Sequence, residues 1–255
     1  MNFLDPSVKK GFYGTSCIYN VWLLEIWTFF QTFAPQIRFN IMQKYMLSDT
    51  AIKILTVLYI VGIGGFLLNI HSDFRLLTPV NLVVSLVIAL VFHPNWSLKF
   101  VFWCLLTMLV GFYIEVVGVS TGQIFGQYQY GSTLGFKYEN TPLSISVNWL
   151  LTAYSAAALV SLATAETFKW FYKALFAAAL MVSLDSFIEP IAHKLDMWSW
   201  QNGVIPFQNY VGWFCTALPL QMLFFYFIRS AKNKVAVAVL LLQFAFFLLL
   251  NAFLK

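Results

Sequence analysis

The run FYKALFAAALMVSLDSFIE, residues 171–189, decides the fold of this chain. It is about as long as the roughly 20 mostly apolar residues that an α-helix needs to cross the hydrocarbon core of a bilayer. Two carboxylates, Asp185 and Glu189, stand in its last turns. An acidic side chain at bilayer depth costs about 2.5 to 3.5 kcal/mol on insertion scales, so such residues usually face an internal site. The run therefore predicts a membrane-spanning helix with a functional site at one end.

The composition of the whole chain indicates a membrane protein. Of its 255 residues, 60% are hydrophobic and only 10% are charged, and a water-soluble domain could not hide that much apolar surface. The net charge is +5, but the Lys and Arg residues are scattered between apolar runs and form no basic patch. We therefore expect a multi-pass protein of the cell (cytoplasmic) membrane, with the lipid bilayer as a partner and no nucleic acid.

Apolar runs of similar length recur along the chain and predict an all-α, polytopic transmembrane helical bundle of about eight spans, with seven as the alternative. The expected spans are residues 18–37, 54–70, 76–92, 100–119, 142–163, 171–189, 209–228 and 235–254. The sequence contains no internal repeat or linker that would separate them. We therefore expect residues 1–255 to form a single integral membrane domain.

The basic residues between the spans indicate an orientation. With eight spans, nine Lys and Arg residues fall on one face of the membrane and six on the other. This modest bias favours both termini outside the cytoplasm. With either number of spans, we expect Glu115, Asp185, Glu189 and the turn at Asp73 and Arg75 to lie on the same side.

Three carboxylates, Glu115, Asp185 and Glu189, are the candidate catalytic residues, because each stands near the end of an apolar run. Asp185, Glu189 and His193 are spaced four apart, so they would line one face of a continuing helix. Pro190 favours a kink or a break at this point. Three ionisable groups could therefore converge near the end of this span.

Such a cluster allows several interpretations. It could bind a metal through its carboxylates and His193, or it could handle protons without a metal. It could also only lock helices together by pairing with Arg75, with Lys194 or with backbone donors. We favour the proton-handling interpretation, with no metal and no cofactor, because a protonated carboxyl group in a dry pocket can act as a general acid.

Two unusual connections, which begin at Glu115 and at Asp185, enclose the motif-bearing part of the chain, residues 115–213. The first contains five glycines together with Tyr128 and Tyr130. Glycine permits tight turns, and tyrosine can cover an apolar opening while its hydroxyl forms hydrogen bonds. This composition favours a lid over a pocket, although an aromatic belt at the membrane interface would have a similar composition.

The two connections together resemble a known family, and the resemblance depends on residues in both of them. The matching residues are Glu115, Gly118, Val119, Thr121, Gly122, Phe125, Gly126, Tyr128, Tyr130, Pro142, Trp149, Asp185, Glu189, Pro190, Ala192, Trp198, Trp200, Pro206, Asn209, Gly212 and Trp213. In these positions the chain resembles the membrane-embedded carotenoid biosynthesis family typified by the carotenoid 1,2-hydratases of bacteria and archaea.

The resemblance implies a carotenoid hydratase, a hydro-lyase that adds water across the terminal C1,C2 double bond of an acyclic (psi) end group. Its substrate would be γ-carotene or a lycopene-like carotenoid, and its product a tertiary alcohol. A C40 polyene is about as long as the ~30 Å hydrocarbon core, so its enzyme should lie in the membrane. Other enzymes of the carotenoid pathway are candidate partners.

The expected roles follow this chemistry. Asp185 would protonate C2, and Glu189 and Glu115 would position or deprotonate the water that attacks C1. Aromatic faces would stabilise the cation that develops at C1. The expected substrate-binding residues are Tyr128, Tyr130, Trp198, Trp200, Asn209 and Trp213. The expected supporting residues are His193, Arg75 and Thr121.

Three other functions have to be weighed. A carotenoid cyclase would use the same acid but capture the cation with an internal double bond. A proton-coupled transporter also needs acids inside the membrane, but the chain contains no inverted repeat. A retinal-binding photoreceptor would need a lysine in the middle of a late span, and residues 209–228 and 235–254 contain none.

Overall fold

The computed structural model describes residues 46–68 and 70–254. The residues from Ser48 onward fall in one compact unit. The expected span at 18–37 lies outside the described residues. The expectation of one domain over residues 1–255 therefore stays a prediction.

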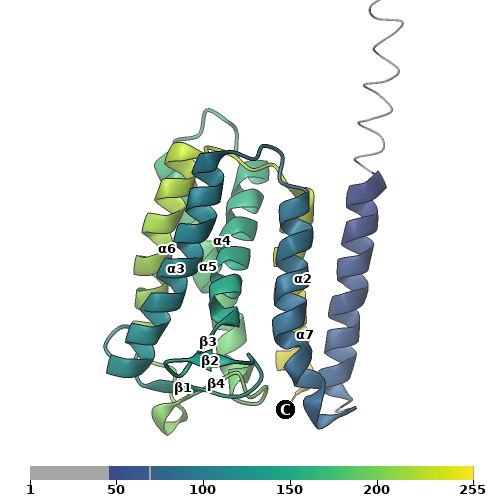
Figure 1. Cartoon of the computed structure of the whole chain (residues 1–255), viewed down its shortest axis with the longest axis vertical. Coiled ribbons are helices and arrows are strands. Elements are labelled where there is room, and N and C mark those ends of the chain that lie inside the picture. The colour runs from purple at the N-terminus through teal and green to yellow at the C-terminus, as the bar shows by residue number, and fades with distance from the viewer. Residues whose placement is uncertain (1–45, 69, 255) are drawn as a thin grey trace, which may run out of the picture. The chain divides into compact units, whose positions relative to one another are not determined.

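Seven helices of the described part are long and apolar enough to cross a bilayer (Figure 1). They are Met46–Leu67, α2 (Thr78–Val91, preceded by the 3-10 turn η1, Ser72–Leu77), α3 (Leu98–Thr121), α4 (Ser144–Ala163), α5 (Trp170–Ala192), α6 (Phe207–Phe227) and α7 (Lys234–Phe253). The prediction of an all-α membrane bundle is confirmed. Each expected span from 54–70 onward overlaps one of these helices.

Local sequence signals set several helix ends. The hydroxyl of Ser97 accepts a hydrogen bond from the backbone N–H of Phe100 and caps α3. The same helix ends at Gly122, whose φ of 67° is the left-handed conformation that glycine adopts without strain. Helix α5 continues through Pro190 and ends two residues later, at Ala192. The break expected at this proline is therefore displaced to the end of the helix.

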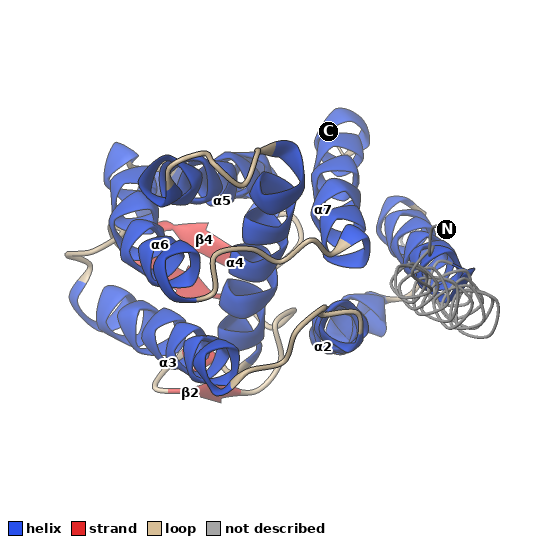
Figure 2. Cartoon of the chain, turned by 90° about the horizontal axis from the view of Figure 1, so that it is seen from above, coloured by secondary structure: helices blue, strands red, loops and turns tan. Residues whose placement is uncertain are grey.

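Helix α4 is the centre of the unit. It packs against α2, α3, α5, α6 and α7. Of its most apolar stretch, 72% is buried, compared with 22% for the span that contains α2. Small residues such as Ala156, Ala157 and Ala158 let the neighbouring helices approach closely. Viewed along the helices, α3, α4, α5 and α6 form one group, and α2 and α7 lie on the far side of α4 (Figure 2).

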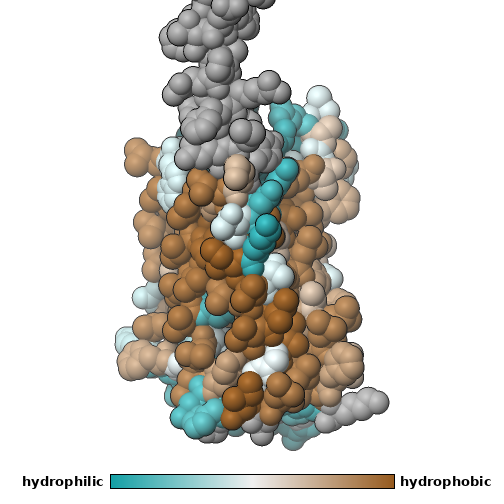
Figure 3. All heavy atoms as spheres, turned by 90° about the vertical axis from the view of Figure 1, so that its right-hand side faces the viewer, coloured by the Kyte–Doolittle hydropathy of each residue, from teal (hydrophilic) through white to brown (hydrophobic). Residues whose placement is uncertain are grey.

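The outward-facing side chains are mostly apolar, as a bilayer requires. Leu105, Leu109, Val87 and Leu248 are examples of large apolar residues that are more than half exposed. Figure 3 shows apolar side chains over most of the visible middle of one face. Together with the seven spans, this surface identifies a membrane protein.

Short strands join the two long connections at one end of the helices (Figure 1). Strand β1 (Tyr128–Tyr130) pairs antiparallel with β4 (Trp198–Trp200), and Tyr128 lies opposite Trp200. A second pair joins β2 (Lys137–Tyr138) to β3 (Thr141–Pro142). The strand pair β1 and β4 therefore brings the two motif-bearing connections together over the ends of α3 and α5. A short turn, η2 (Gln201–Gly203), follows β4.

Candidate active site

The three candidate carboxylates lie inside the bundle at the end covered by the strands. Glu115 comes from α3, whereas Asp185 and Glu189 come from successive turns of α5. Their exposed fractions are 3%, 1% and 3%. The four-residue spacing predicted from the sequence places Asp185 and Glu189 on one face of α5. All three line the same small cavity.

Glu115 receives hydrogen bonds on both carboxylate oxygens. Its Oε2 accepts from the hydroxyl of Tyr128 at 2.5 Å and from that of Tyr130 at 2.7 Å. Its Oε1 accepts from the indole N–H of Trp149 at 3.1 Å. The two tyrosines belong to β1 and Trp149 belongs to α4. Glu115 therefore connects α3 both to the strand pair β1 and β4, which we call the cover, and to the central helix α4.

Glu189 is held in a similar way from the second connection. Its Oε2 accepts from the indole N–H groups of Trp198 at 3.2 Å and Trp200 at 2.6 Å. Its Oε1 accepts from the side-chain amide of Asn209 at 2.9 Å. Both oxygens of this carboxylate are therefore occupied by protein donors.

Asp185 differs from the other two acids. Its Oδ2 accepts from the Asn209 amide at 2.8 Å, so Asn209 bridges Asp185 and Glu189. Its Oδ1 is buried and has no hydrogen-bond partner in the described part of the chain. Buried polar atoms in proteins are usually paired, so an unpaired carboxyl oxygen at a cavity is a candidate functional atom.

No cation offsets the charge of this cluster within residues 46–68 and 70–254. The ion pairs found there join His71 to Asp73, Arg75 to Asp196 and Lys232 to Glu166. Neutral O–H and N–H donors surround the three carboxylates instead. A cluster held only by neutral donors leaves its protons free to move within the site, whereas an ion pair would fix a charge there.

The tyrosine hydroxyls at the site remain donors. Burial raises the pKa of Tyr128 and of Tyr130 well above the usual value, and the negative charge of Glu115 raises both further. Neither hydroxyl therefore loses its proton near neutral pH. Their hydrogen bonds to Glu115 hold the cover in place.

The cavity between the acids is small. Its volume is about 20 Å³, which is enough for one water molecule. Its lining consists of Glu115, Phe125, Tyr128, Tyr130, Ile145, Asn148, Asp185, Ile188, Glu189, Trp198, Trp200, Asn209 and Trp213. The site therefore combines three carboxylates, aromatic walls and room for a single small polar molecule.

A larger apolar pocket lies beside this cavity. Its volume is about 250 Å³, and Tyr59, Phe66, Leu82 and Phe246 are among its lining residues. Four residues line both spaces, namely Ile145, Asn148, Ile188 and Trp198. The side chains of these four residues separate the acid cavity from the apolar pocket.

Close packing fixes the aromatic walls. The rings of Trp149 and Trp213 stack at 4.2 Å with an angle of 10° between their planes. A Cβ atom on Gly118 would lie 2.6 Å from the ring of Phe125 and 3.1 Å from the Tyr128 hydroxyl. This glycine, which the sequence placed in the motif, therefore lets the aromatic cover approach α3 and reach Glu115.

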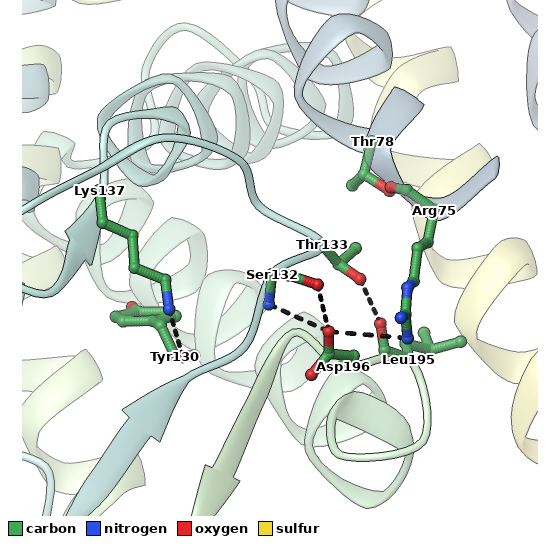
Figure 4. Close-up of polar contacts among 8 residues, drawn as sticks. All are labelled: Arg75, Thr78, Tyr130, Ser132, Thr133, Lys137, Leu195 and Asp196. Carbon is green, nitrogen blue, oxygen red and sulfur yellow. Dashed lines mark hydrogen bonds and ion pairs between the residues drawn. The ribbon is translucent and has the colours of Figure 1, made fainter. Parts of the chain in front are cut away.

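Polar contacts outside the cavity hold the cover together (Figure 4). The carboxylate of Asp196 accepts from both the backbone N–H and the hydroxyl of Ser132, and it lies 3.6 Å from the guanidinium of Arg75. These hydrogen bonds to Ser132, with the charge of Arg75, hold the pKa of Asp196 below its usual range. The contacts join both connections to η1. We call Arg75, Ser132 and Asp196 the surface clasp.

The structure brings most of the predicted site residues together. Those at the acid cavity are Glu115, Asp185, Glu189, Tyr128, Tyr130, Trp198, Trp200, Asn209 and Trp213. The three supporting residues, His193, Arg75 and Thr121, do not join them. Helix α5 ends at Ala192, and His193, its C-cap residue, is exposed. Arg75 pairs with Asp196, and the Thr121 hydroxyl donates to its own helix at Val117.

The sequence pointed less clearly to other residues of the site. Trp149 and Phe125 belonged to the matching motif but were not predicted to bind substrate, because each reads as an ordinary aromatic residue in an apolar context. Ile145, Asn148 and Ile188 carried no signal at all. Only the packing of α4 against α5 shows that these three line the cavity.

No group of three His, Cys, Asp or Glu side chains in the described part of the chain has a geometry that could hold a metal ion. The convergence of carboxylates and His193 that a metal site would have used is not formed, because His193 is exposed whereas the three acids are buried around a cavity that it does not line. The donors around the three carboxylates are instead hydroxyl, indole and amide groups.

Comparison with known proteins gives one match. A family model described as "Carotenoid biosynthesis protein" matches residues 77–255, which is more than half of the chain. The match covers α2 to α7 and all three carboxylates of the cavity. No curated protein and no solved structure matches the chain.

Proposed function

We propose that this chain, which belongs to the carotenoid biosynthesis protein family, is an enzyme that hydrates the end of an acyclic carotenoid. The reaction adds water across the terminal C1,C2 double bond and gives a tertiary alcohol. Family membership supports a role in the carotenoid pathway, and the site supports the type of reaction.

One observation carries the proposal. Three buried carboxylates surround a space for one water molecule, and this space lies beside an apolar pocket. Hydration of an alkene needs an acid, one water molecule and an apolar binding site for the hydrocarbon. The site contains a candidate for each requirement.

The hydrogen bonds favour Asp185 as the acid. Both oxygens of Glu115 and both oxygens of Glu189 accept from protein O–H or N–H groups. A carboxyl oxygen that carries a proton must donate it, so an oxygen already facing a donor is poorly placed for that role. Among the described residues, Asp185 Oδ1 is the only one of the six oxygens without a partner. It is therefore the best position for the transferable proton.

The proposed steps balance. The O–H bond of Asp185 breaks and a C–H bond forms at C2, which leaves a tertiary cation at C1 and a carboxylate on Asp185. The water oxygen then bonds to C1 while Glu189 or Glu115 accepts one of its protons. That proton returns to Asp185 within the cavity that all three carboxylates line. The net change is the addition of one water molecule to the substrate.

The aromatic walls suit the cation formed in the first step. The faces of tryptophan and tyrosine rings attract positive charge, and this attraction is worth about 2 kcal/mol or more when the site is dry. Trp198, Trp200, Trp213 and Tyr128 line the cavity. The Trp198 and Trp200 N–H groups and the Tyr128 hydroxyl donate to carboxylates, so these rings provide an apolar wall around the reacting end.

Product analysis tests the proposal. Membranes containing the full chain are supplied with an acyclic carotenoid in ¹⁸O-labelled water, and the products are separated and weighed by mass spectrometry. Hydration adds the mass of one labelled water molecule. Cyclisation of the same end leaves the mass unchanged and would contradict the proposal, as would an unmodified pigment together with a change in proton flux.

A pair of matched variants locates the chemistry. We expect Asp185→Asn to lower the rate of hydration about 10²- to 10⁴-fold, the usual contribution of a general acid. Glu166→Gln removes an exposed carboxylate that pairs with Lys232 away from the cavity, and it should leave the rate unchanged. Equal rates in the two variants would rule out Asp185 as the acid.

A further inference from the structure

The apolar pocket beside the acid cavity extends to the outer surface of the bundle. It lies between the helix Met46–Leu67, α2 and α7. Two of its lining residues, Val61 and Val80, are more than half exposed on the apolar exterior. At the inner end, Ile188 and Trp198 line both the pocket and the acid cavity. A lipid-soluble molecule can therefore enter from the bilayer side and contact residues that also line the acid cavity.

Three amide side chains, Asn81, Asn148 and Gln243, line this otherwise apolar pocket, and two of them, Asn81 and Gln243, have an unpaired oxygen. Asn81 lies on α2 and Gln243 on α7. The side-chain oxygen of each is buried and has no hydrogen-bond partner among the described residues. Gln243 as a whole is only 3% exposed. Leaving a buried acceptor without a donor is unfavourable, so such atoms usually pair with a ligand or with water.

We propose that this pocket binds an isoprenoid that carries a hydroxyl group, and that Asn81 and Gln243 hydrogen-bond this hydroxyl. The two unpaired atoms are acceptors, so the missing partner is a donor. A hydrocarbon has no donor, and a ketone or an ether only accepts. A hydroxyl can donate to one of the two amide oxygens and accept from the amide nitrogen of the other side chain, and a water molecule can pair with the second oxygen.

The inference rests on the proposed function only in taking the ligand to be an isoprenoid. It adds that the protein distinguishes a hydroxylated chain from a bare hydrocarbon. The reaction that precedes this one would then be one that introduces oxygen into the isoprenoid.

Competitive binding of three probes tests the inference. The detergent-solubilised full chain is mixed with geranylgeraniol, its methyl ether and the corresponding C20 hydrocarbon, and the bound molecules are counted by native mass spectrometry. The alcohol should bind about tenfold better than the ether, which is the effect of one hydrogen bond to a buried group. Equal binding of alcohol and ether would overturn the inference, because the amides would then pair with water alone.

Variants identify the atoms responsible. Asn81→Leu and Gln243→Met keep the side-chain volume but remove the amide, and each should reduce the preference for the alcohol. Gln123→Met, an exposed residue after α3, is the matched control and should keep it. A preference that persists in the double variant Asn81→Leu with Gln243→Met would contradict the assignment.

The same assay separates this inference from the proposed function. Asp185→Asn should keep the preference for the alcohol although it slows hydration, because Asp185 does not line the pocket. A preference for the alcohol without any hydration would leave the ligand class standing and contradict the reaction. Hydration without any preference for the alcohol would support the reaction and contradict the ligand class.

Discussion

The bundle contains two buried polar networks, one at each end, and they differ in how completely their atoms are paired. At the end opposite the acids, Asn233 donates to the backbone oxygen of Ala89 and to the Tyr154 hydroxyl, and its own oxygen accepts from two backbone N–H groups. The ring of His93 is paired through both nitrogens. The acid network leaves Asp185 Oδ1 unpaired and encloses a cavity.

This difference distinguishes structural polar groups from candidate functional ones. The network around Asn233 consists of neutral groups, since burial lowers the pKa of His93 and keeps the ring uncharged. Complete pairing of this kind stabilises a fold. A network of three carboxylates that has one unpaired oxygen and no cationic partner in residues 46–68 and 70–254 stabilises a fold poorly. Its arrangement is better explained by chemistry.

Among the variants that test this difference between the two networks, Glu189→Gln should have the largest effect. The carboxylate accepts on both oxygens, from Asn209 on one and from Trp198 and Trp200 on the other. A glutamine has one acceptor oxygen, so its NH₂ group would face an N–H donor. We expect hydration to fall at least about 100-fold, measured as product formed in reconstituted membranes. Glu166→Gln is again the exposed control, and a normal rate in Glu189→Gln would contradict a role in handling water.

The next largest effect should appear at the opposite end, in stability. Asn233→Ala removes the N-cap of α7 and leaves the Ala89 oxygen without its donor. The lost cap and the unpaired buried group should together lower the free energy of unfolding by about 2 to 4 kcal/mol. Denaturation in mixed micelles measures this change. The rate per folded molecule should stay normal, and a selective loss of activity would show that this network is part of the site.

A smaller effect is expected where the central helix supports the site. Trp149→Phe keeps a ring that can stack on Trp213 but removes the N–H that donates to Glu115. We expect about a tenfold loss of hydration, the effect of one hydrogen bond to a charged group. The measurement is the rate at saturating carotenoid. An unchanged rate would limit Trp149 to packing.

The sequence predicted the helices more reliably than the site, and the reason is physical. A span needs about 20 apolar residues in succession, a local property that showed every helix from Met46–Leu67 to α7. The spacing of Asp185 and Glu189 was also local, and it correctly placed them on one face. The pairing of Tyr128 with Trp200 joins segments about 70 residues apart, and it could be reached only through the resemblance of both connections to one family.

The site residues whose positions the sequence did not predict show that local sequence signals do not reveal contacts between segments. His193 continued a helical spacing, but α5 ends one residue before it. Arg75 looked like a partner for the buried acids, and the structure gives it the exposed Asp196 instead. Asn148 carried no signal, because its contact with both cavities depends on how α4 packs against its neighbours. Such contacts are properties of the packed bundle and leave no mark in a single segment.

The smallest effect should come from the surface clasp, the exposed counterpart of the buried networks. The pKa of Asp196 is lowered in the folded protein by Ser132 and Arg75. Its stabilising contribution is therefore complete above the unfolded pKa of about 3.9 and is lost as the pH falls through the lower folded value. Because the side chain is 38% exposed, the contribution should stay below about 1 kcal/mol.

Asp196→Asn isolates this contribution, because asparagine tolerates the positive φ of 53° at this position. The free energy of unfolding in micelles, measured from pH 7 down to about pH 3, should fall less steeply in the variant than in the natural chain. Hydration at neutral pH should be nearly unchanged, since the clasp lies outside the cavity. Identical pH dependence in the two proteins would show that the clasp contributes nothing, and a large loss of activity would make it part of the site.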